Sequence, residues 1–61
     1  MRSIGQQLKL IVGLLDTKDV NDWEDDFIRS VWEQSNDGKN TSKLSEKQVN
    51  IIERIHNKHF A

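Results

Sequence analysis

Apolar residues recur along the first segment of the chain at the spacing of an amphipathic helix. The positions that share this spacing are Ile4, Leu8, Ile11, Val12 and Leu15. Intervals of four, three, one and three residues place them on one side of a helix that faces a core. The pattern predicts a helix over residues 3–15. The two glycines within it each cost about 1 kcal/mol relative to alanine, so we expect this helix to depend on packing against its neighbours.

A second helix is predicted after the turn-forming residues 16–19. Asn21 suits the N-cap position, and Glu24, three residues later, suits the reciprocal position of a capping box. The helix should end near Gln34 or Ser35, because the residues that follow are polar, contain glycine and show no periodicity.

Both tryptophans fall on this second helix, nine positions apart, and therefore point in different directions. The apolar side of the helix is formed by Val20, Trp23, Phe27, Ile28 and Val31. We therefore expect Trp23 to lie in the core. The pattern leaves open whether Trp32 packs at the edge of the bundle or stacks on a base or on a partner protein.

A third helix is predicted to begin at residues 44–48, where three signals coincide. The Ser45 hydroxyl can accept a hydrogen bond from the Gln48 amide, the Gln48 side chain can return it, and Leu44 can pack on Val49. The inward face of this helix is expected to contain Gln48, Ile51, Ile52, Ile55 and His59. Phe60 is expected to close its end.

These elements predict an all-α fold, a small three-helix bundle that forms a single domain over residues 1–61. The pattern leaves open whether a fourth short helical turn lies within residues 16–20 or 37–43. No apolar run approaches the ~20 residues that a membrane span needs, so no contact with a membrane is expected. The absence of cysteine fits a reducing compartment, and we expect a cytoplasmic protein, in the host cytoplasm if it comes from a phage.

Charge is distributed unevenly along the chain, although the net charge is only −1. Residues 16–37 contain eight acidic residues and two basic ones, a net charge of −6. Residues 38–61 contain five lysines or arginines and two glutamates, a net charge of +3. A charged partner could therefore bind to either side of the molecule.

The basic residues of the third helix are candidate contacts for nucleic acid. Lys47, Arg54 and Lys58 are spaced by seven and four residues, which places them within about 40° around the helix axis. The full candidate set is Lys43, Lys47, Asn50, Arg54, Asn57 and Lys58. Lysine and arginine can displace counterions from phosphates while amides position the backbone. The same pattern also fits a solvated helix face.

The acidic second helix gives a rival candidate site, for a basic protein partner. Its predicted contacts are Asp25, Asp26, Trp32 and Glu33. The carboxylates near the start of the helix also have a simpler role, because they favour the positive end of the helix dipole.

Neither a metal site nor a catalytic site is predicted. His56 and His59 are three residues apart but have no third ligand at suitable spacing, and the acidic residues lack the spacing of a calcium loop. No combination of nucleophile, base and orienting group is recognisable, nor is a phosphate-binding glycine loop. We therefore expect a noncatalytic protein without metal or cofactor.

Two motifs together resemble a known group of proteins. Residues 22–34 read DWEDDFIRSVWEQ, and after a polar loop residues 44–48 read LSEKQ and open a helix that ends in Lys58 and His59. This pattern is similar to small modules of phage DNA-processing proteins, in particular the C-terminal accessory segment associated with the UvsW recombination helicase of T-even phages. The likeness covers roughly residues 8–60 and rests on short motifs. It implies a helical accessory module that acts on single-stranded or branched DNA beside a helicase or a single-strand-binding protein.

Overall fold

The structure is a computed structural model that describes residues 3–60. Its elements are α1 (Ile4–Val12), α2 (Asp22–Gln34), the short 3-10 helix η1 (Thr41–Lys43) and α3 (Glu46–Phe60). No strand occurs in this part of the chain. The prediction of a small all-α, three-helix bundle is confirmed, and the short fourth turn lies in the second of the two segments considered.

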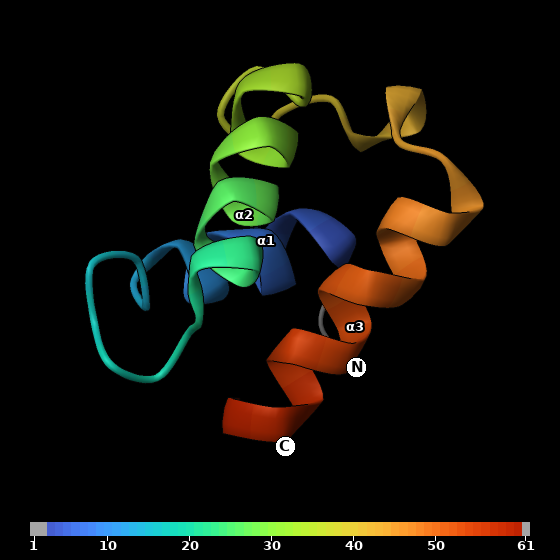
Figure 1. Cartoon of the computed structure of the whole chain (residues 1–61). Coiled ribbons are helices and arrows are strands. Elements are labelled where there is room, and N and C mark those ends of the chain that lie inside the picture. The colour runs from blue at the N-terminus through green and yellow to red at the C-terminus, as the bar shows by residue number, and fades with distance from the viewer. Residues whose placement is uncertain (1–2, 61) are drawn as a thin grey trace.

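Helix α1 packs against both other helices, and in Figure 1 it lies behind α2. The chain runs from the end of α2 through η1 to the start of α3 (Figure 1). Apolar residues from all three helices and two connections form the core, namely Leu8, Ile11, Val20, Ile28, Val31, Leu44, Ile52 and Ile55. The radius of gyration of 10.3 Å agrees with about 10.5 Å for a folded chain of this length.

Helix α1 ends at Val12, three residues before the predicted end. Leu14 donates a backbone hydrogen bond to Ile11, three residues back, so the chain tightens into turns after Val12. At Asp16 the backbone enters the left-handed region, with φ 63°, which a continuing helix cannot accommodate. At the other end Ser3 forms a capping box with Gln6, which was not predicted.

The predicted starts of α2 and α3 are confirmed. Asn21 accepts from the Glu24 amide at 2.7 Å, and Glu24 Oε1 accepts from the Asn21 amide at 3.0 Å. Gln48 and Ser45 exchange the same pair of hydrogen bonds at 2.8 and 3.1 Å. Each box fixes the residue at which its helix begins.

The prediction that Trp23 lies in the core is wrong, since 61% of Trp23 is exposed. The buried side of α2 is centred on Ile28 and Val31, and Trp23 lies about 140° and 80° around the helix axis from them. Trp32 is instead the tryptophan that packs against the core. A Cβ on Gly38 would lie only 3.1 Å from Trp32 Cζ3, so the indole covers this glycine.

The loop after α2 is organised by a buried serine, which the sequence did not reveal. Ser35 is completely buried, donates its hydroxyl to the Trp32 carbonyl and accepts from the Gly38 amide, both at 3.1 Å. Gly38 has φ 84°, a conformation that favours glycine.

Two polar side chains in the helices are also buried, and neither was predicted to face the core. Gln7 on α1 is 6% exposed, and His56 on α3 is 5% exposed. His59, which was expected to face inward, is only partly buried, and Phe60 at the end of α3 is 37% exposed. Helix α3 is therefore rotated slightly toward His56 relative to the predicted inward face.

Candidate nucleic-acid interface

Lys47, Arg54 and Lys58, the cations predicted to share one side of α3, are all exposed. Their spacing places them within about 40° around the helix axis. Ile52, which is fully buried, lies about 120–160° around the axis from each of them. The three cations therefore point away from the core, and we call them the basic face of α3.

The basic face carries positive charge that the protein does not neutralise. Within residues 3–60, none of its three members forms an ion pair. Arg54 and Lys58 are four residues apart, a like-charge spacing that costs a helix about 0.2–0.5 kcal/mol. Lys58 also lies in the last turn of α3, where the helix dipole favours a cation. The positive charge is thus available to an anionic ligand.

Two exposed amides border the basic face on one side. Asn50 makes no hydrogen bond through its side chain to another described residue, and the Asn57 Oδ1 atom lies 3.1 Å from His56 Nδ1. The Asn57 amide group is therefore oriented by a buried histidine. Both amides have donors that can reach a phosphate oxygen bound at the basic face.

Lys43 is held next to the start of α3 by a chain of side-chain contacts. Gln34, at the end of α2, donates to the Lys43 carbonyl at 3.3 Å and accepts from Gln48 Nε2 at 3.1 Å. Gln48 is in turn the capping residue that accepts from the Ser45 amide. These contacts fix the backbone of η1 relative to both helices, while the Lys43 side chain stays exposed.

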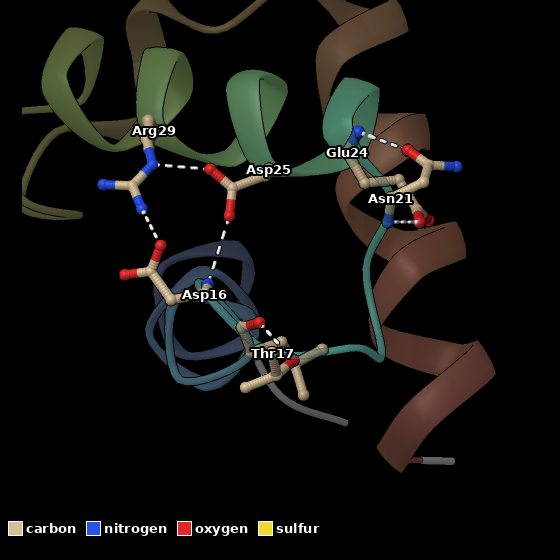
Figure 2. A network of polar contacts seen from close by, with 7 residues as sticks. Asp16, Thr17, Asn21, Glu24, Asp25 and Arg29 are labelled. Carbon is tan, nitrogen blue, oxygen red and sulfur yellow. Dashed lines mark hydrogen bonds and ion pairs between the residues drawn. The ribbon is translucent and has the colours of Figure 1, made fainter.

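The acidic side of the molecule contains a fixed ion-pair network (Figure 2). Arg29 Nε donates to Asp25 Oδ1 at 2.6 Å, and Arg29 Nη2 donates to Asp16 Oδ1 at 2.8 Å. The second oxygen of Asp25 accepts from the Asp16 backbone amide at 3.1 Å. The network therefore joins the turn after α1 to the first half of α2.

This network shifts the pKa values of Asp25 and Arg29. The hydrogen bond from Arg29, followed by that from the Asp16 amide, lowers the pKa of Asp25 below its ordinary value. The same contacts with Asp25 and Asp16 raise the pKa of Arg29. Asp25 thus remains ionised and occupied by contacts within the protein.

The residues predicted to bind a basic partner do not form one surface. Asp26 and Glu33 are exposed and seven positions apart, so they share a side of α2. Asp25 and Trp32 lie about 100° around the helix from that pair, and both are engaged inside the molecule, Asp25 by Arg29 and Trp32 by Gly38. Only Asp26 and Glu33 remain available as a pair.

A shallow hollow of about 430 Å³ lies between the turn after α1 and the start of α2. Asp16, Asp22, Asp25 and Asp26 are among its lining residues. Among the described residues, no group of three or more histidines, cysteines or carboxylates is arranged to hold a metal ion. The charge of this hollow would repel a nucleic acid.

Sequence reasoning missed one exposed feature, a stacked pair of aromatic rings on α2. The rings of Trp23 and Phe27 lie 5.5 Å apart, centre to centre, with an angle of 7° between their planes. The four-residue spacing predicts such a contact. Centring the helical projection on Ile28 and Val31 would have placed Trp23 outside the core.

Comparison of the chain with protein-family models, curated proteins and solved structures gave no match. The resemblance to phage DNA-processing modules therefore stays a prediction. None of the helices in the described part of the chain is long and apolar enough to cross a membrane.

Proposed function

We propose that this chain is a noncatalytic, nucleic-acid-binding accessory module of a phage-type helicase or recombination system. In this proposal the basic face of α3 binds the DNA backbone weakly and without sequence preference, assisted by Lys43, Asn50 and Asn57. The observation that supports it best is that the basic face is exposed and lacks ion pairs within the described chain, whereas Arg29 is neutralised by two carboxylates.

The dimensions of the basic face suit a run of phosphates. Lys47 and Lys58 are eleven residues apart, or about 16 Å along a helix. One strand of B-DNA carries four to five phosphates over a similar axial distance, at about 3.4 Å each. Binding would release the counterions condensed on those phosphates, and this release supplies the favourable free energy.

The acidic segment determines which form of DNA is favoured. Residues 16–37 carry a net charge of −6 and would repel phosphates that approach α2 or the adjoining turn. A flexible single strand can follow α3 alone, whereas a continuous duplex brings more charge close to the protein. We therefore expect single-stranded or branched DNA to bind better than duplex DNA, and all affinities to be modest.

The helicase setting in this proposal comes from the sequence resemblance. An accessory module that binds weakly gains effective concentration when it is held beside a motor protein or a single-strand-binding protein on the same DNA. Such a partner would convert the weak attraction of α3 into retention on the strand. The proposal therefore includes a helicase or a single-strand-binding protein as a partner.

A matched pair of charge-reversal variants tests the proposal. Lys47→Glu with Arg54→Glu reverses two charges on the basic face, and Lys9→Glu with Lys18→Glu reverses two exposed charges elsewhere. Both variants have the same net charge, so a general electrostatic effect would weaken both equally.

We expect the first variant to bind a fluorescent single-stranded oligonucleotide at least about tenfold more weakly than the second. Helicity, measured by circular dichroism, serves as the folding control. Equal affinity of the two variants would show that α3 does not carry the binding.

A further inference from the structure

The exposed aromatic pair on α2 has no role in the proposed DNA contact. Trp23 is 61% exposed and is not part of the hydrophobic core. Phe27 is only partly buried and packs against that core. Phe27 therefore anchors the pair to the protein, and Trp23 forms its outer layer.

The geometry of the stack leaves one face of the indole open. The two rings are nearly parallel, with an angle of 7° between them, so one face of Trp23 lies against Phe27. With 61% of the residue exposed, the opposite face is in contact with solvent. Large exposed aromatic surfaces are enriched where proteins bind partners.

Two carboxylates beside the indole determine the charge of a suitable partner. Asp26 lies three residues after Trp23, and Asp22 lies four residues before Asp26, so these side chains are neighbours on the helix surface. Both are exposed, and neither carboxylate has an ion pair or hydrogen-bond partner among residues 3–60. Asp22 lies in the first turn, but Asp26 lies beyond it, so the helix dipole does not account for Asp26.

We propose that Trp23, Phe27, Asp22 and Asp26 form a docking surface for a basic segment of another protein that presents an arginine. The guanidinium would stack on the open face of Trp23, because a cation is attracted to the face of an aromatic ring and indole binds it best. Asp26, and Asp22 beyond it, would accept hydrogen bonds from the same guanidinium or from an adjacent basic residue. Nucleic acid is disfavoured here by the carboxylates.

This surface differs from the one expected from sequence, which used Trp32, and it is independent of the basic face of α3. The aromatic pair provides the surface on which the partner would stack, and the acidic residues select the sign of the partner's charge. Arginine is preferred over lysine because its planar group can stack and donate hydrogen bonds at the same time.

The test is an NMR titration of the full chain with a short synthetic peptide of alternating arginine and glycine. The chemical shifts of the backbone amides and of the indole N–H groups report binding. A peptide with glutamate in place of arginine is the charge control. We expect shifts at the Trp23 indole and at residues 22–27, and a loss of affinity of at least about fivefold in Trp23→Leu, which keeps an apolar side chain but removes the π face.

Two further variants separate the roles of charge and position. Asp26→Asn should weaken the binding of the arginine peptide. Glu33→Gln removes an exposed charge further along the same side of α2, and it should leave the affinity for the peptide within about twofold of the wild type. Absence of shifts around Trp23, or equal affinity of the wild type and Trp23→Leu, would overturn the proposal. Concentration-dependent self-association that Trp23→Leu abolishes would also overturn it, because the occupant would then be a second copy of this chain.

Discussion

The carbonyl oxygen of Gly38 lies so close to α1 that a Cβ on Gly5 would approach it to 3.0 Å. The loop after α2 thus touches the first turn of α1 backbone to backbone, and a side chain at Gly5 would have to displace the Gly38 carbonyl. Gly13, by contrast, is exposed and in the right-handed helical region, and the nearest atom to its Cβ would be a carbonyl of its own turn, at 3.2 Å.

The two glycines of the first segment should therefore respond in opposite ways to alanine. Gly13→Ala is expected to raise the free energy of unfolding by about 0.4–1 kcal/mol, because alanine restricts the unfolded chain and the Leu10 carbonyl beside the new Cβ needs to move by only a few tenths of an ångström. Gly5→Ala is expected to lower it, because the gain in helix propensity is smaller than the cost of displacing the loop. Urea denaturation of both variants measures this difference, and stabilisation by Gly5→Ala would show that the contact is loose.

Replacing Ser35 by alanine should destabilise the protein by about 1–3 kcal/mol, since it leaves the partly buried Gly38 amide without its acceptor and empties a fully buried site. Ser30→Ala on the exposed side of α2 is the control and should change stability by less than about 0.5 kcal/mol. Chemical denaturation of both variants measures the two changes in the free energy of unfolding. Equal stability would mean that water replaces the Ser35 hydroxyl.

Stability should depend on pH through Asp25. Its pKa in the folded protein is depressed by Arg29 and the Asp16 amide, so the unfolded chain binds the proton more readily than the folded one. The contribution of Asp25 to stability is present above the ordinary aspartate pKa and is lost as the pH falls through the lower, folded-state pKa. Thermal unfolding of the wild type and Asp25→Asn should differ near neutral pH and converge in acid, and a constant difference would contradict this.

The salt dependence of DNA binding should report the number of phosphate contacts. If Lys43, Lys47, Arg54 and Lys58 each neutralise one phosphate of a single strand, the logarithm of the binding constant falls with the logarithm of salt concentration with a slope of about −3. Lys58→Gln should reduce the magnitude of that slope by about 0.7. Fluorescence anisotropy at several salt concentrations measures it, and a slope near zero in the wild type would exclude phosphate contacts.

Local signals were sufficient to predict where the last two helices begin. Asn21 with Glu24, and Ser45 with Gln48, are reciprocal caps that depend on residues only three positions apart. The exposure of Lys47 and its basic neighbours also followed from helical spacing. These features need no knowledge of distant parts of the chain.

Features that depend on contacts between distant residues were not predicted. The end of α1 at Val12 is accompanied by the network that joins Asp16 to Asp25 and Arg29, nine and thirteen positions away. The position of Trp23 was mistaken, and that of Trp32 was left open, because hydrophobicity alone does not reveal which side of α2 meets α1. The same limit applies to the burial of Ser35, which depends on the path of the loop after α2.

Helices α2 and α3 both pack against α1. The backbone amide protons of α1 should therefore exchange with solvent only when the whole protein unfolds. They should exchange more slowly than amide protons near the ends of the helices. A destabilising substitution in α1 should therefore weaken binding at both proposed surfaces. A substitution on the outer side of α2 or α3 should weaken binding at one surface and leave the other unchanged. Substitutions on the outer sides of α2 and α3 should therefore separate the two proposed binding activities.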